Sequence, residues 1–315
     1  MKAIQITAFG GPEVMQYTDL PDPVAGGSEI VLDVTAVGIN YADTHQTENS
    51  YLSPQSLPMV PGIEVTGTHA GKRYLASVSS GGYAQKAIAH EAALIPIPDA
   101  VTDQQALCML VQGSTAWHLL KTMGSVKAGQ TVVIHAAAGG VGTIAIQLAK
   151  MWGAKVIAVT SSQEKVDLAK SLGADEVVDA RDADLGKALR AANGGRGVDL
   201  VLEMVGGTTF DQSFLALGNF GKLITFGMAS RTAPTPIHPG SLMHGSKTVA
   251  GFWLANCFGK KELMNDVIAE LFALVASGKL RPVIGSTYPL SKAADAHRAM
   301  LARETTGKVA LDPAL

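Results

Sequence analysis

The sequence is poor in cysteine, with Cys108 and Cys257 as the only two among 315 residues. Two thiols are too few for a disulfide framework or a four-thiolate zinc site, so a reducing compartment fits best. Charged residues are also scarce, at 17% of the chain, but apolar residues make up 47%, which excludes an intrinsically disordered protein. The N-terminal stretch lacks the apolar block of a signal peptide, and we therefore expect a cytoplasmic protein.

Several kinds of functional motif are absent as well. The formal net charge is -2 and the sequence has no basic cluster, which makes nucleic acid a poor partner. There is no HExxH, no CxxC and no His/Cys pair at ligand spacing, so we predict no metal site, and no GxSxG marks a serine hydrolase. Only residues 132–149 approach the length of a membrane span, and their internal glycines indicate a strand, a turn and a helix instead. We expect no membrane partner.

Two kinds of pattern divide the chain, whose length favours two domains. The first third alternates short apolar and polar runs, as at Ile30, Leu32 and Val34, which is typical of half-buried strands. From about Gly113 onward, helical patterns separate six apolar blocks of strand length, at 131–136, 155–160, 176–179, 198–204, 221–226 and 247–252. This alternation is the pattern of a doubly wound parallel sheet. We predict an α/β domain over 114–252 and a β-rich domain over 1–113 that residues 253–315 complete, with a helix at about 260–277 and a last strand near 308–311.

A glycine turn follows the first of these blocks and opens a helix. It reads AAGGVG over 137–142 and fits the dinucleotide-binding fingerprint, except that Ala137 replaces the first glycine. In that fingerprint Gly139 lets the backbone approach a pyrophosphate, and Gly142 lets the helix pack closely on the strand. The helix N-terminus offers N–H groups and a partial positive charge to phosphates. We predict that a dinucleotide binds here, rather than an ordinary glycine turn, through four residues: Ala138, Gly139, Gly140 and Val141.

The end of the second block bears on which dinucleotide binds. NAD-binding proteins carry an Asp or Glu about 20 residues beyond the turn, which bonds the ribose 2′-hydroxyl. No acid stands there in this chain, which reads VTSSQEK over 159–165. A carboxylate would repel a 2′-phosphate, so its absence favours NADPH, with Ser161 and Lys165 as phosphate ligands. The alternative is structural: Ser161 and Glu164 have the spacing of a helix capping box, and Lys165 is then a solvated charge. Both interpretations can hold together.

Several further stretches carry a resemblance to a known family. They are GINYAD at 38–43, PGIEVTG at 61–67, GGYA at 81–84, VDLVLEMVGG at 198–207 and GKV at 307–309. With the glycine turn, they resemble the medium-chain dehydrogenase/reductase superfamily, in its zinc-free, zeta-crystallin-like quinone oxidoreductase branch. Zinc alcohol dehydrogenases of that superfamily have a Cys where this chain has Asn40 and a His where it has Ile63. The resemblance implies a Rossmann domain, a GroES-like β-rich domain and hydride transfer from NADPH without a metal.

The resemblance also assigns roles to individual residues. It implies that Asn40, Gly227 and Lys308 contact the cofactor and that Asn40 and Tyr51 serve the chemistry, with a surface-loop aromatic as the alternative for Tyr51. The acceptor is expected to be a quinone or a conjugated carbonyl such as an enone. The alternatives are an enal or enoyl-thioester double-bond reductase and a non-catalytic, crystallin-like NADPH-binding protein. We also expect a homodimer formed through the Rossmann domain, with the strand at 248–252 near a sheet edge that pairing would cover.

Two features depart from the family pattern. The segment 68–76 is shorter than the hairpin of relatives, and Lys72 stands where they have an Asp. Some relatives also place a tyrosine against the adenosine phosphate where this chain has Ala180. Arg181 is the neighbour that could supply this contact.

Overall fold

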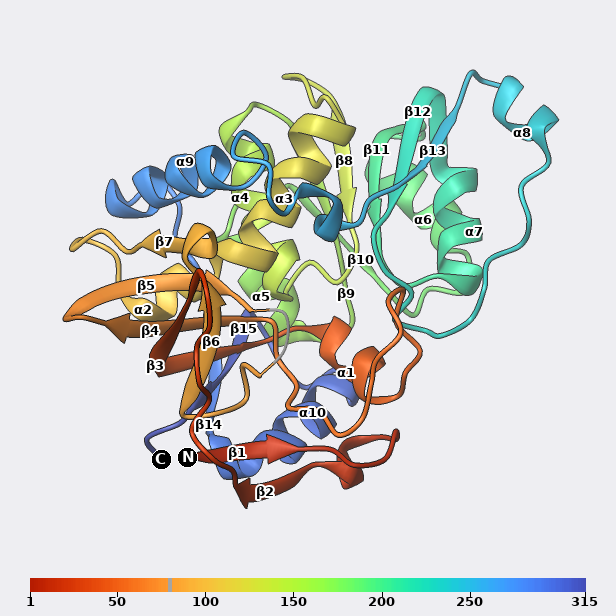
Figure 1. The fold of residues 1–315 in the computed structure, drawn as a ribbon. Coiled ribbons are helices and arrows are strands. Elements are labelled where there is room, and N and C mark those ends of the chain that lie inside the picture. Colours follow the sequence, from red (N-terminus) through yellow and green to blue (C-terminus); the bar gives the residue numbers. More distant parts are fainter. Residues whose placement is uncertain (79–80) are drawn as a thin grey trace. The chain divides into compact units, whose positions relative to one another are not determined.

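Six parallel strands form one sheet in the middle of the chain, in a computed structural model that describes residues 1–78 and 81–315. The spatial order is β10-β9-β8-β11-β12-β13, so the chain starts at the centre of the sheet and winds outward both ways (Figure 1). This is the Rossmann order, and it confirms the predicted fold class. The strands are β8 (Thr131–Ile134), β9 (Lys155–Thr160), β10 (Glu176–Asp179), β11 (Val198–Glu203), β12 (Leu217–Thr225) and β13 (Thr248–Gly251).

The helices that connect successive strands from β8 to β12 bury apolar residues on the sheet. They are α4 (Gly140–Met151), α5 (Gln163–Ser171), α6 (Leu185–Ala192) and α7 (Gly207–Ala216), with α3 (Ser114–His118) before the sheet and α8 (Pro239–Met243) before its last strand. Leu189 of α6 and Phe210 of α7 pack in one cluster with Val133 and Val201 of the central strands. The β-branched runs of the strands are buried because helices cover the sheet.

A second, mostly antiparallel sheet belongs to the other unit of the chain, which consists of Met1–Gln112 and Phe258–Leu315. Its order is β14-β15-β3-β4-β5-β7, and β6 also pairs with β3. The strands are β3 (Glu29–Ile39), β4 (Glu64–His69), β5 (Lys72–Ser77), β6 (Lys86–His90), β7 (Leu94–Pro96), β14 (Ile284–Pro289) and β15 (Lys308–Asp312), beside a β1 (Lys2–Gln5) and β2 (Gln16–Asp19) pair. Because β15 pairs with β3, the C-terminal tail completes this unit.

Four helices accompany that sheet: α1 (Tyr41–Thr47), α2 (Asp103–Leu107), α9 (Asn265–Ala276) and α10 (Ala293–Leu301). The helix expected from about residue 260 begins only at Asn265, so that boundary was wrong. The buried side of α9 starts at Val267, whereas Lys260 and Lys261 are exposed and precede the helix. Apolar spacing locates the buried face of a helix but not its first residue.

The shortened segment 68–76 forms a tight hairpin between β4 and β5. Ala70 and Gly71 make the two-residue turn, with φ values of +48° and +74°. Two left-handed residues give a turn whose twist matches that of the flanking strands, and His69 pairs directly with Lys72. The shortening therefore leaves the sheet register intact.

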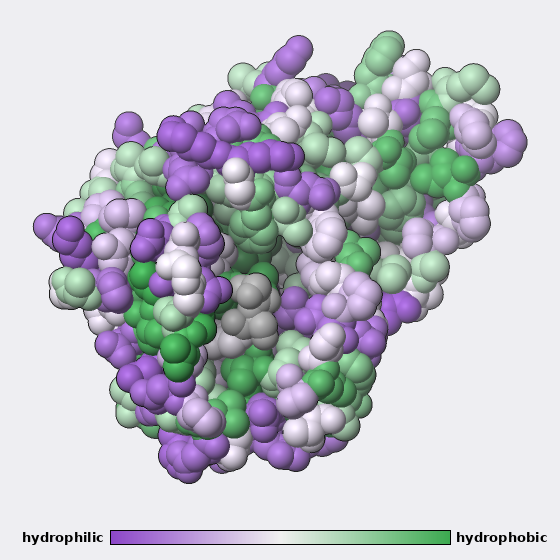
Figure 2. Space-filling model, viewed as in Figure 1, coloured by the Kyte–Doolittle hydropathy of each residue, from purple (hydrophilic) through white to green (hydrophobic). Residues whose placement is uncertain are grey.

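None of the helices formed by the described residues is both long and apolar enough to cross a membrane. Hydrophilic and apolar side chains are interspersed on the face of the molecule in Figure 2.

Candidate functional site

The glycine turn connects β8 to α4 with two differently constrained glycines. Gly139 is the N-cap of α4 and has no side chain with which to cap the N–H groups of the first turn. A Cβ atom on Gly139 would lie 3.2 Å from the carbonyl oxygen of Ala136, whereas one on Gly142 would lie 2.5 Å from that oxygen and 2.6 Å from the Cα of Ala137. The fold itself therefore requires glycine at 142. At 139 the only close contact is this tight but smaller overlap with the Ala136 oxygen, and the missing side chain leaves the helix N-terminus open to a ligand.

The predicted cofactor residues of the parallel-sheet unit gather at one edge of the sheet. Ala138 belongs to the turn after β8, Gly140 begins α4, Ser161 follows β9, and Gly227 lies two residues beyond β12. A Cβ atom on Gly227 would lie 3.2 Å from the Cβ of Met204, just beyond β11. The carboxyl ends of parallel strands meet at the same edge, which is where open α/β sheets bind ligands.

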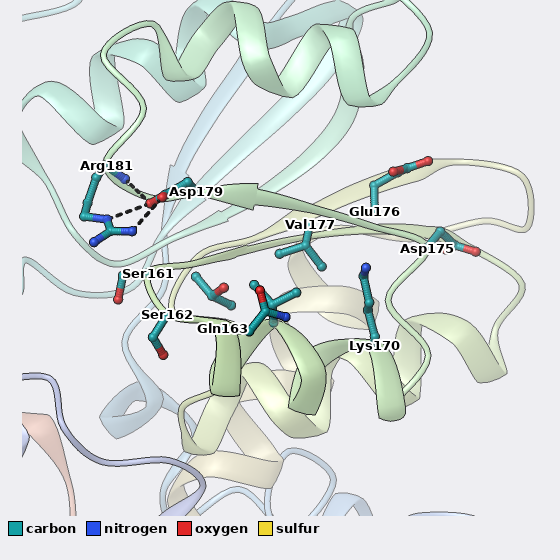
Figure 3. Close-up of a pocket in the computed structure, with 11 residues that line it drawn as sticks. Ser161, Ser162, Gln163, Lys170, Asp175, Glu176, Val177, Asp179 and Arg181 are labelled. Carbon is teal, nitrogen blue, oxygen red and sulfur yellow. Dashed lines mark hydrogen bonds and ion pairs between the residues drawn. The ribbon is translucent and has the colours of Figure 1, made fainter.

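An open hollow of about 400 Å³ lies between α5 and the β9–β10 edge (Figure 3). Ser161, Ser162 and Arg181 stand at one end of it, and Lys170 stands at the other. Arg181 is ion-paired with Asp179 at 2.8 Å, and this contact lowers the pKa of the Asp179 carboxyl to about 2. Asp179 is thus an acid near the expected 2′-phosphate position that was not predicted from the sequence at the end of β9, because it ends the next strand of the sheet, β10.

The expected capping box of Ser161 with Glu164 was wrong. The helix begins one residue later, and its N-cap is Ser162, whose hydroxyl accepts from the Lys165 N–H at 3.4 Å. Strand β9 runs to Thr160, so Ser161 still belongs to the connection and lines the hollow. Lys165 lies half-buried in the first turn of α5 and is not among the described residues that line the hollow.

A buried cluster of three polar side chains lies in the β-rich unit. Asn40 follows β3, Glu64 begins β4 and Lys308 begins β15. The Asn40 amide donates to Glu64 Oε1 at 2.8 Å, and the Lys308 ammonium donates to Asn40 Oδ1 at 3.1 Å and is ion-paired with Glu64. The other Glu64 oxygen accepts from the Val111 N–H at 3.1 Å. The cluster is therefore a charge-balanced unit in the core, with at most 4% of any of its three members exposed.

Asn40 and Lys308 were predicted from the sequence, whereas Glu64 was not. A signal was present, because a charged residue in an apolar strand is almost never fully buried without a partner.

Zinc does not fit this cluster. The Lys308 ammonium neutralises the Glu64 carboxylate and donates to Asn40 Oδ1, the atom that would otherwise face a cation, and Ile63 offers no ligand atom. Within 1–78 and 81–315, no group of three or more His, Cys, Asp or Glu side chains is arranged to hold a metal ion.

A second buried network supports the backbone at Asn40, where helix α1 begins. Asp43 Oδ2 accepts from the Asn40 N–H at 3.0 Å and from the Tyr83 hydroxyl at 2.8 Å. The same hydroxyl lies 2.9 Å from His297 Nε2 on α10. Burial raises the pKa of Asp43 to about 7 and lowers the pKa of His297 to about 4. Helix α1 is thus fixed at its start by a hydrogen-bonded chain that reaches α10.

Asp43 gives the protein a specific pH dependence. The unfolded chain releases this proton near pH 4, whereas the folded protein keeps it to about pH 7, so the contribution of Asp43 to folding stability falls as pH rises between these values. His297, whose pKa is lowered to about 4, contributes in the opposite sense, so the Asp43 contribution is isolated by comparing the wild type with a variant. Asp43→Asn lacks this slope. Between pH 5 and pH 7 the variant should gain about 2 to 3 kcal/mol relative to the wild type, measured from urea unfolding. Equal pH slopes for the two proteins would contradict the assignment.

Tyr51 lies half-buried in the segment between α1 and β4. The side chain of Asn49 accepts a hydrogen bond from the Gln55 N–H at 3.0 Å and closes a short loop that contains Tyr51. This loop and Asn40 belong to the same unit of the chain.

Comparison with known proteins gives consistent matches. A family model described as zinc-binding dehydrogenase matches residues 140–273. A quinone oxidoreductase of Pseudomonas aeruginosa is 33% identical over 325 residues, with 99% of both chains covered. The solved quinone oxidoreductase of Thermus thermophilus, also determined with NADPH, is 36% identical with a TM-score of 0.89, and 99% of this chain and 100% of that one are covered. The Escherichia coli quinone oxidoreductase complexed with NADPH is 31% identical, with the same coverage and a TM-score of 0.93.

Proposed function

Because the chain belongs to the medium-chain dehydrogenase/reductase superfamily, in its quinone oxidoreductase branch, we propose that it transfers hydride from NADPH to a quinone or a similar conjugated carbonyl. The observation that carries this proposal is the open α4 N-terminus at Gly139, at the sheet edge where open α/β sheets bind ligands, together with relatives of known structure that were solved with NADPH. NADPH oxidation in the presence of a quinone tests it.

NADPH, when bound, supplies the hydride. The role of the protein is to bind and orient the cofactor. Ala138, Gly139, Gly140 and Val141 would present their backbone to the pyrophosphate, which the uncapped first turn of α4 favours electrostatically. Ser161 and Lys165 would bind the 2′-phosphate, with Arg181 as a further cation at the end of β10. As the family resemblance implies, Asn40, Gly227 and Lys308 would contact the cofactor, and Asn40 and Tyr51 would serve the chemistry.

NADPH should bind better than NADH, and Lys165→Ala should narrow the difference by weakening NADPH. A charge-assisted phosphate contact contributes about 1.5 to 3 kcal/mol, which is roughly one to two decades of affinity. Lys170→Ala is the matched control, because it removes the same charge from the same helix at the far end of the hollow. Titration of NADPH and NADH into the wild type and the two variants measures the six affinities. Equal affinities of the wild type for NADPH and NADH would refute the phosphate assignment.

We further propose that catalysis needs no zinc. The Asn40, Glu64 and Lys308 cluster supports this, because its charges are already balanced. Activity should survive a chelator, and one tightly bound zinc per chain in a metal analysis would contradict the proposal.

The homodimer is proposed from the sheet. β13 is the last strand in the sheet order, and pairing with a second copy would cover its edge. Light scattering at micromolar concentration should give twice the chain mass, and a monomer would count against the dimer.

A further inference from the structure

A second open hollow, of about 390 Å³, lies at the amino edge of the parallel sheet, opposite the glycine turn. The residues around it immediately precede β11 and β13, begin β12 or end α6. Every charged side chain in its lining is basic, and the lining contains no Asp or Glu among the described residues. The lining consists of Arg190, Gly195, Arg196, Gly197, Leu217, Gly218, Asn219, His244, Gly245 and Lys247.

Backbone oxygens hold two of these cations in place. The Arg190 guanidinium donates to the carbonyl oxygens of Leu215 at 3.0 Å and Leu217 at 2.9 Å. The Lys247 ammonium donates to the carbonyl oxygen of Phe214 at 3.3 Å and lies 4.7 Å from the centre of its ring. The carbonyls of Phe214 and Leu215 belong to the last turn of α7, and Leu217 is its C-cap, so all three lie where the helix dipole carries a partial negative charge. The cations are therefore positioned by fixed dipoles.

The positive charge of the hollow is not balanced by carboxylates. In the described part of the chain, neither Arg190, Arg196, His244 nor Lys247 forms an ion pair. Burial, and then the neighbouring Arg190, lower the pKa of Lys247, as expected where like charges stand together. An anion between the two side chains would relieve this repulsion. The hollow at the other edge differs, because Arg181 there already pairs with Asp179.

We propose that the hollow lined by Arg190, Arg196, His244 and Lys247 binds a phosphate group, carried by a small phosphomonoester. The exposed Arg196 guanidinium can bind two phosphate oxygens as a pair. Arg190, whose Nε and one Nη donate to backbone carbonyls, adds its remaining donor and its charge, and Lys247 binds as a point charge. The volume is that of a small-molecule site, roughly 300 to 1,000 Å³, and so leaves room for an organic group beside the phosphate. The site is separate from the cofactor edge and does not depend on the proposed hydride transfer.

Calorimetric titration of the full chain at low ionic strength tests this, with saturating NADPH present to occupy the cofactor edge. The two probes are inorganic phosphate and glycerol 3-phosphate. Arg196→Gln and Lys247→Gln should each weaken binding roughly tenfold or more, because each loses a charge-assisted contact. Lys187→Gln is the matched control: it removes a charge from the exposed side of α6, outside the lining, and should change affinity less than about twofold.

Tighter binding of glycerol 3-phosphate than of phosphate would support the ester as the ligand. Equal affinities for the two probes would support a phosphate site and overturn the proposal that its ligand is a phosphomonoester. No binding of either probe to the wild type would overturn the proposal, and so would equal affinities of Arg196→Gln and Lys187→Gln. Arg196 is exposed, so its replacement leaves the fold intact and keeps this comparison valid if Lys247→Gln proves unstable.

Discussion

Glu64→Gln should lower the free energy of unfolding by about 3 to 5 kcal/mol, because it leaves the Lys308 ammonium in the core without a counter-charge. Glu64 and Lys308 are both almost fully buried, so water cannot replace the lost carboxylate. The variant also weakens the acceptor of the Asn40 amide, which the wild type holds at 2.8 Å. Urea unfolding of the two proteins measures the difference.

Two further variants make this result specific. The double variant Glu64→Gln/Lys308→Met removes both charges and should recover part of the loss, since a buried ion pair can often be replaced by apolar groups at little cost. Lys261→Gln breaks an exposed ion pair with Asp266 in the same unit and should cost less than about 1 kcal/mol. A loss in Glu64→Gln no larger than that in Lys261→Gln would mean that the buried pair has no structural role.

Gly142→Ala should both destabilise the protein and impair NADPH binding. In an unhindered helix this change would stabilise by about 1 kcal/mol. Here the new Cβ atom would lie 2.5 Å from the carbonyl oxygen of Ala136 and 2.6 Å from the Cα of Ala137, and both are backbone atoms that move only with the turn. Overpacking of this kind costs about 1 to 3 kcal/mol. Displacing the turn should weaken NADPH binding roughly tenfold or more.

Gly139→Ala separates binding from folding at the same turn. Its Cβ atom would have only the Ala136 oxygen nearby, at 3.2 Å, so the unfolding free energy should change by less than about 1 kcal/mol. The added methyl would still stand where the pyrophosphate is proposed to approach, and NADPH affinity should fall. Thermal unfolding and NADPH titration of both variants give the comparison. If Gly139→Ala bound NADPH as tightly as the wild type, the pyrophosphate would not lie at this turn.

The parallel sheet was predictable because its signals are local. Val132, Val133 and Ile134 form a β-branched run, and the glycines that follow within eight residues mark the turn and the helix start. The order of the strands follows from the way βαβ units wind. The first residues of the helices were harder to predict. Ser161 and Ser162 are equally good N-caps of α5 in sequence, and the length of β9 decides between them.

The polar networks of the β-rich unit were not predictable from spacing. Lys308 meets Asn40 across 268 residues, and His297 meets Tyr83 across 214. These contacts exist only because the C-terminal tail returns to β3, and no pattern within one segment encodes that pairing. The basic hollow at the amino edge has the same origin, since α6, β12 and the turn before β13 each contribute one or two cations or polar groups.

The most direct measurement is NADPH oxidation with a panel of quinones, enones and enoyl thioesters, by the wild type and by Tyr51→Phe. The proposed function predicts turnover with quinones. Tyr51→Phe should keep the quinone rate within about threefold, because water can protonate the product oxygens, whereas loss of a true general acid costs about 100-fold or more. Turnover confined to enones or thioesters, with a large loss in Tyr51→Phe, would instead indicate a double-bond reductase. No NADPH oxidation with any acceptor would contradict the enzyme assignment itself.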